Sequence, residues 1–149
     1  MTDLFISSEI DDDSWGDNIT LGGKAKAFQW KLDDTFTLHI NRPFENGNIK
    51  FTAEQLDRIA DYVAQNCEVA LGNSVSKLAD GTEREGLGKF MHNSMGLTIT
   101  EAQTSSQLAA LFVQACIWKW NDQKRGMTFR IIRTNWRQEL RRYYDQATK

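Results

Sequence analysis

The chain has 149 residues and a formal net charge of −2, with 40% hydrophobic and 11% aromatic residues. This length and composition fit one compact domain and exclude wholesale disorder. Two distant cysteines, Cys67 and Cys116, exclude a disulfide framework and predict free, buried thiols in a reducing compartment.

The first 23 residues contain six acids and no Lys or Arg. This composition predicts an acidic, flexible tail over residues 1–23, allows one short strand near residues 19–21, and leaves residues 24–149 as a single domain. The N-terminus lacks the basic and apolar regions of a signal peptide, and no apolar run approaches the length of a membrane span. We therefore expect a soluble cytoplasmic protein that does not associate with membranes.

The next segment shows strand and then helix signals. Phe36, Leu38 and Ile40 alternate with polar residues, and the Asp33-Asp34 pair lies between two such runs, which predicts a β-hairpin. A helix is predicted to follow Thr52, because Gln55 stands three residues later, as in a capping box.

The second half of the chain predicts a polar loop over 72–86, a short helix closed by Gly96, and a longer helix with Thr100 as its cap. A hairpin is then predicted, with strands "IWKWN" and "MTFRII" and a turn at 122–126. The spacing of Trp136, Leu140 and Tyr144 predicts a final amphipathic helix. The fold class expected from this order is α+β.

A short helix, a tight connection, a longer helix and a two-stranded hairpin follow one another over residues 86–132. In this order and spacing the stretch "GLGKFMHNSMGLTITEAQTSSQLAALFVQACIWKWNDQKRGMTFRII" resembles the winged helix-turn-helix family. The resemblance implies a winged-helix-like C-terminal half, with residues 105–116 in the recognition helix and 117–132 as the wing. It also implies double-stranded DNA as a partner.

One face of the longer helix is uncharged, small and rich in amides. Such residues suit the major groove, because close approach needs small side chains and a glutamine can pair with adenine at two atoms. We expect this face to read bases through Gln103, Ser106, Gln107, Ala110 and Gln114. The alternative is that the same face packs on another part of the protein or on a second subunit.

Positive charge gathers at the C-terminal end. Residues 111–149 contain nine Lys or Arg and three acids, a formal charge of +6, which leaves −8 on residues 1–110. The asymmetry favours an anionic partner, although a basic but merely solvated surface also explains it. In the first case the expected phosphate contacts are Lys124, Arg125, Arg130, Arg133, Arg137 and Arg141.

Two tryptophans lie two residues apart in the first strand of the predicted hairpin. Trp118 and Trp120 therefore point to the same side, where they either stack on single-stranded bases or, as we favour, form core beneath the wing.

The sequence holds no recognisable catalytic set. Its two histidines, His39 and His92, have no His, Cys or acid at metal-ligand spacing, and the glycines at 81 and 86 do not complete a phosphate loop. We expect no metal, no cofactor and no enzymatic activity.

The leading hypothesis is a small DNA-binding protein in which the acidic tail competes with nucleic acid for the basic face. The alternative is a protein-interaction or homo-oligomerisation module whose uncharged helix face and tryptophans meet a second copy or an acidic protein. The least favoured reading is a small enzyme with a site formed only in three dimensions.

Overall fold

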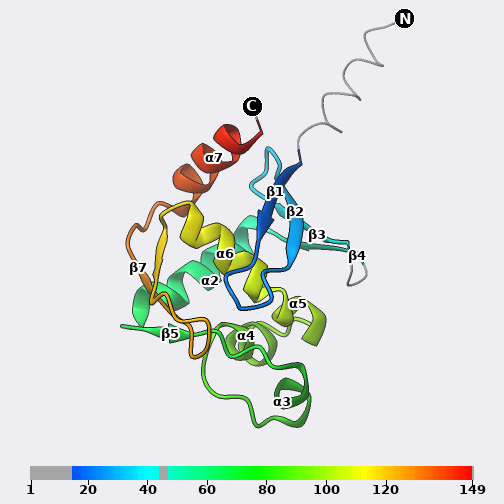
Figure 1. Cartoon of the computed structure of the whole chain (residues 1–149). Helices are drawn as coiled ribbons and strands as arrows, with labels where there is room; N and C mark the ends of the chain where they lie inside the picture. The colour runs from blue at the N-terminus through cyan, green and yellow to red at the C-terminus, as the bar shows by residue number, and fades with distance from the viewer. Residues whose placement is uncertain (1–14, 44–46, 149) are drawn as a thin grey trace, which may run out of the picture.

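The computed structural model describes residues 15–43 and 47–148, and these form an α+β fold with two antiparallel sheets (Figure 1). The α+β class expected from the sequence is confirmed. A four-stranded sheet uses the N-terminal third of the chain, and a three-stranded sheet combines the predicted hairpin with a strand from the middle of the chain. Residues 1–14, which hold most of the predicted acidic tail, lie outside the described residues.

The larger sheet is a meander of β1 (Gly16–Ile19), β2 (Ala27–Leu32), β3 (Leu38–Arg42) and β4 (Gly47–Phe51). The predicted hairpin is confirmed as β2 and β3, which pair antiparallel around residues 33–37. Buried side chains alternate along both strands, as period-2 geometry requires. β1 pairs with β2 from Gly16 to Ile19, so the end of the segment predicted as a tail contributes a strand to this sheet.

The helix predicted after Thr52 is α2 (Ala53–Gln65). The Thr52 hydroxyl accepts a hydrogen bond from the Gln55 amide at 3.2 Å, and the Gln55 side chain accepts one from the Thr52 amide at 2.9 Å. This capping box satisfies two amides that the helix cannot pair internally, so the helix start is encoded locally.

After α2 the chain forms β5 (Val69–Ala70), α3 (Val75–Asp80), α4 (Leu87–Lys89) and the π-helical turn η1 (Phe90–Ser94). The backbone that follows β5 crosses closely over the backbone at the start of α4. A Cβ on Gly86 would lie 2.6 Å from the Ala70 carbonyl oxygen, and one on Gly88 would lie 2.7 Å from Cα of Asn73. Because the neighbours are backbone atoms, only glycine fits this crossing. The crossing fixes the path of residues 71–75.

The longer predicted helix is divided into α5 (Ile99–Gln103) and α6 (Ser105–Gln114). Its cap is Thr98 rather than Thr100, because Thr98 and Glu101 form the reciprocal hydrogen bonds of a capping box at 3.1 and 2.8 Å. Gly96, at φ +73°, closes the preceding helix as predicted.

The predicted hairpin is confirmed as β6 (Trp118–Trp120) and β7 (Thr128–Ile131). β5 pairs with the other edge of β7, which gives the small sheet the order β5-β7-β6. The predicted final helix is α7 (Trp136–Ala147), with Trp136, Leu140 and Tyr144 buried.

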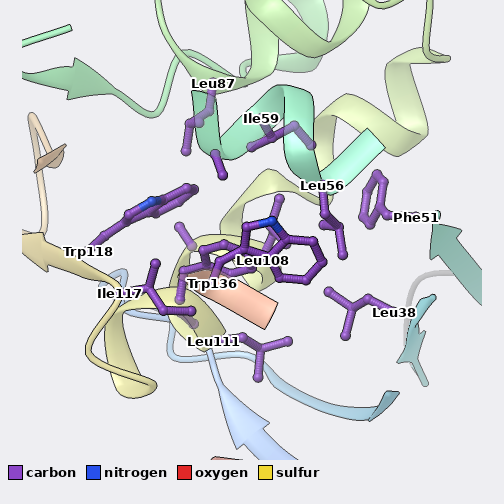
Figure 2. Close-up of a cluster of buried hydrophobic side chains, with 14 of the residues drawn as sticks. Leu38, Phe51, Leu56, Ile59, Leu87, Leu108, Leu111, Ile117, Trp118 and Trp136 are labelled. Carbon is purple, nitrogen blue, oxygen red and sulfur yellow. The ribbon is translucent and has the colours of Figure 1, made fainter. Parts of the chain in front are cut away.

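One hydrophobic core joins both sheets and the helices between them (Figures 1 and 2). Figure 2 shows Leu38 and Phe51 of the large sheet in the same cluster as Trp118 of the small one. Helix α6 contacts β1 on one side and β6 on the other. The two sheets are therefore parts of a single folded unit.

Both cysteines are free thiols, but they are exposed rather than buried as predicted. Cys116 ends the α6 segment at φ +63°, where its side chain turns outward. Within the described residues, no helix is long and apolar enough to cross a membrane.

Candidate nucleic-acid interface

The uncharged helix face predicted to read bases is largely inside the protein. Gln107 is 3% exposed and Ala110 is 0% exposed, because β1 and α7 pack against α6. Ala110 has no exposed surface, and Gln107 exposes only a small part of its side chain, where it lines a hollow beside the hairpin. This burial corresponds to the alternative in which the face packs on another part of the protein.

The other three residues of that face do not share one surface. Gln103 and Ser106 are half-buried and line a hollow beside the hairpin, together with Lys24 and Lys26 of the β1–β2 turn. Gln114 is exposed and lines a different hollow, with Arg133 and α7. Gln103, Ser106 and the small exposed part of Gln107 therefore line one hollow, and Gln114 lines another.

Three of the predicted phosphate contacts hold the fold together instead. Arg133 donates a 2.8 Å hydrogen bond to the Cys116 carbonyl oxygen. Arg137 pairs with Asp57 at 2.8 Å. Arg141 donates hydrogen bonds of 3.2 and 2.6 Å to the carbonyl oxygens of residues 32 and 33, and its guanidinium lies over the Phe36 ring. A guanidinium has five N–H donors, so the exposed Arg133 and Arg137 keep further donors beside these contacts, whereas Arg141 is partly buried.

The other basic residues form what we call the wing cluster: Lys119, Lys124, Arg125 and Arg130. All four are exposed, and within residues 15–43 and 47–148 none of them forms a salt bridge. Lys119 stands directly opposite Arg130 across the β6–β7 ladder. Like charges in directly opposed positions destabilise a sheet.

The tip of the hairpin is held by its own hydrogen bonds. The Asn121 side chain donates to the Gly126 carbonyl oxygen at 3.0 Å and accepts from the Gln123 amide at 3.1 Å. Trp120 donates through its indole nitrogen to the Gln123 carbonyl oxygen at 3.2 Å. These bonds order the turn that carries Lys124, so its backbone is positioned without a partner.

Two adjoining hollows lie beside the hairpin, one next to α3 and the loop that follows it, and one next to the β1–β2 turn. The first has a volume of about 380 Å³ and includes Lys77, Arg84 and Lys124 in its lining. The second has a volume of about 310 Å³ and includes Lys24 and Lys26. Both are lined by Leu71, Asn73, Ser74 and Met127, so they adjoin at these four residues, which we call the ridge. We call the two hollows together the basic groove.

The only carboxylate lining either hollow, among the residues the structure describes, belongs to Glu83. It is 7% exposed and accepts hydrogen bonds from the Ser74 amide at 2.7 Å and the Arg84 amide at 2.8 Å. Each of its two oxygens thus accepts a hydrogen bond from a backbone amide. The side chains that project around it are cationic, which makes the groove attractive to anions.

The two tryptophans of β6 serve the core and the turn. Trp118 is 1% exposed and packs against Phe112, with ring centroids 4.7 Å apart. Trp120 is half-buried and bonded to the hairpin turn. The core interpretation is confirmed for Trp118, which cannot stack on a base in this fold.

The structure pairs His39 with Asp33, which the sequence spacing did not indicate: His39 Nε2 lies 2.9 Å from Asp33 Oδ2. Partial burial raises the pKa of Asp33, but hydrogen bonds from His39, Thr35 and Thr37 outweigh it and hold that pKa well below its usual range. No group of three or more metal-ligating side chains occurs among the described residues.

Comparisons of the chain with protein-family models, with curated proteins and with solved structures found no match. The site must therefore be judged from its own geometry.

Sequence reasoning missed four residues of this surface. Lys119 could have been predicted from the sequence, because the turn predicted at 122–126 sets a strand register in which Lys119 lies opposite Arg130. Lys24, Lys77 and Arg84 carry no local signal, because Lys24 comes from the β1–β2 turn, Lys77 from α3 and Arg84 from the loop after it, and these segments meet the hairpin only in the folded chain.

Proposed function

We propose that this protein binds DNA through its basic β6–β7 hairpin, used as a wing. The observation that carries the proposal is the pair Lys119 and Arg130, two exposed cations placed opposite each other on a ladder with no carboxylate neighbour in a salt bridge among the described residues. Such an arrangement costs stability unless an anion occupies it. A phosphate backbone supplies anions at regular spacing along one line.

The turn of the hairpin extends the same cationic surface. Lys124 and Arg125 project from a tip that hydrogen bonds from Asn121 hold in place. A preordered loop loses little entropy when it binds, which favours affinity. The hairpin contains one acid, Asp122, which adopts φ +61° in the turn.

The helices before the hairpin support the winged-helix interpretation. Residues 95–98 join η1 to α5, and Gly96 in this connection has a positive φ. A connection of this length containing glycine is typical of helix-turn-helix units. β5 pairs with β7 and braces the hairpin against the helices.

The burial of Gln107 and Ala110 changes the mechanism that we propose. Insertion of a whole helix face into the major groove is replaced by contacts from the hairpin, with Gln103 and Ser106 as the accessible polar groups beside it. Phosphate contacts provide affinity and register but carry little sequence information. We therefore propose a DNA-binding protein with weak sequence preference.

The same burial counts against the protein-interaction alternative. That hypothesis required the uncharged face of α6 as a free surface, and β1 and α7 of the same chain cover much of it.

The test is fluorescence anisotropy of a labelled random duplex, titrated at two salt concentrations with the wild type and with the double variant Lys119→Thr and Arg130→Thr. We expect the wild type to bind with an affinity that falls steeply with salt, and the variant to bind more weakly with a smaller salt slope. Unfolding in urea should show the variant to be as stable as the wild type or about 0.2–1 kcal/mol more stable, because the like-charge pair is removed.

The matched control is Lys50→Thr, which removes an exposed cation from β4, on the side of the molecule away from the hairpin (Figure 1). It should bind DNA nearly as well as the wild type. Absence of wild-type binding at low salt would contradict the proposal, and so would equal losses in the control and the hairpin variant.

A further inference from the structure

We infer that the basic groove binds the sugar–phosphate backbone of a nucleic acid strand, so that the N-terminal sheet takes part in the interface. The inference rests on the proposed function and extends it to residues outside the hairpin. Lys24 of the β1–β2 turn stands on one side of the ridge, and Lys77 and Arg84 stand on the other.

The charge of the groove favours a polyanion. Lys24, Lys77, Arg84 and Lys124 form no salt bridge within the described part of the chain, and the one lining carboxylate, that of Glu83, already accepts two backbone amides. Lysines and arginines gathered around a concave surface focus a positive potential there.

The lining argues for a backbone as the occupant rather than for stacked bases or an apolar ligand. None of the described residues that line the two hollows is aromatic, so the groove offers no ring on which a base could stack. It does offer hydroxyl and amide groups, from Ser74, Gln103 and Ser106. Side chains of these types commonly hydrogen-bond to phosphate and sugar oxygens.

The ridge between the hollows is rigidly built. The Asn73 side chain donates a 3.0 Å hydrogen bond to the Gln103 carbonyl oxygen, which ties the ridge to α5. The close crossing at Gly72, Gly86 and Gly88 fixes the backbone on the other side. The cations on either side therefore have a fixed frame on which one strand can rest across both hollows.

Lys124 connects this groove to the wing cluster. It lines the first hollow and also belongs to the hairpin tip. Met127 lines both hollows, so a strand that contacts the hairpin tip at Lys124 can pass over Met127 toward Lys24 in the second hollow.

The test compares the full-length wild type with the double variant Lys77→Ala and Arg84→Ala and, separately, with Lys24→Ala. For each protein, binding to labelled duplex and to labelled single-stranded DNA is measured at several salt concentrations. Both side chains of the double variant are exposed and bear no hydrogen bond or salt bridge among the described residues, so the fold should be retained, which circular dichroism verifies. The control variant Lys50→Ala with Arg58→Ala removes the same charge outside the groove.

We expect the groove variants to lower affinity and to reduce the slope of log affinity against log salt by about 0.9 for each lost duplex contact, or about 0.7 for a single strand. The control should keep the wild-type slope. The nucleic acid form whose binding loses affinity and slope in the groove variants is the form that occupies the groove.

If the groove variants keep the wild-type salt slope while the Lys119 and Arg130 variant has a reduced one, the inference about the groove is wrong. The proposed function of the hairpin would still stand. Absence of nucleic acid binding by the wild type would overturn both. Groove-dependent binding of polyglutamate but not of DNA would assign the groove to an acidic protein and so overturn this inference.

Discussion

The indole nitrogen of Trp136 donates a 2.8 Å hydrogen bond to the Asp57 carboxylate, and this bond joins the first turn of α7 to the middle of α2. Trp136 is 4% exposed, so little of its ring system is in contact with water. The other oxygen of Asp57 accepts from Arg137 at 2.8 Å. One carboxylate therefore anchors the start of α7.

The first prediction follows from this anchor. The substitution Asp57→Ala leaves a buried N–H without a partner, so the free energy of unfolding should fall by about 1–3 kcal/mol. Asp57→Asn keeps an acceptor for Trp136 and should cost less. Urea unfolding measures both, and Asp61→Ala, an exposed acid one turn further along α2, should change stability by less than about 0.5 kcal/mol. Equal effects at Asp57 and Asp61 would show that the bond contributes nothing.

The second prediction distinguishes Arg141, which stabilises the fold, from Lys124, which we propose binds DNA. Arg141 holds the carbonyl oxygens of residues 32 and 33, so Arg141→Gln should lower the free energy of unfolding by about 1–3 kcal/mol. It should change DNA affinity at low salt no more than Lys50→Gln does. Lys124→Gln should behave in the opposite way, with wild-type stability and weaker binding. A loss of binding in Arg141→Gln at a temperature where the variant is fully folded would contradict the assignment.

The third prediction concerns the dependence of stability on pH. The pKa of Asp33 lies below its ordinary value of 3.8 in the folded protein, so its ionised form stabilises the fold above about pH 4. This contribution is lost as the pH falls through the folded-state pKa. Asp33→Asn should therefore be less stable than the wild type at pH 7, and the difference should narrow below about pH 4.

Urea unfolding at several pH values between 7 and 2 measures this difference. The control is Asp34→Asn, which changes the exposed neighbour that forms no hydrogen bond or salt bridge among the described residues. A difference between the wild type and Asp33→Asn that stays constant over the whole range would show that the hydrogen bonds from His39, Thr35 and Thr37 do not stabilise the charged form.

Local signals in the chain determined most of its elements. Thr52 and Gln55 make a capping box from side chains three residues apart, and Leu38 and Ile40 alternate with polar residues along β3, so both features depend only on near neighbours. Phe36, which was predicted to share this alternation, lies instead in the turn before β3 at φ +59°. The helix cap after Gly96 was misplaced because Thr98 and Thr100 both stand three residues before a Glu or Gln. Thr98 caps the helix in the structure, a choice that local spacing did not make.

The sequence also contained a feature that indicates burial of the helix face predicted to read bases. Residues 105–116 contain no charged side chain, and a helix that is apolar nearly all round is usually buried. The amides of Gln107 and Gln114 were interpreted as groups that reach a ligand, whereas Gln107 accepts a 3.0 Å hydrogen bond from Ser106 inside the protein. Burial on both sides requires a partner layer, and that layer is β1, far away in the sequence.

By itself, the sequence determined the α+β class, the hairpin and the gathering of positive charge near the C-terminus. Only the tertiary structure decided which cations remain without an acidic or carbonyl partner among the described residues. Arg137 and Arg141 bind partners 80 and 109 residues away in the sequence, whereas Lys119 and Arg130 lie opposite each other. Local periodicity sets an element because backbone geometry repeats over a few residues. Whether a charge is neutralised depends on side chains brought within a few ångströms by the fold, which no local pattern records.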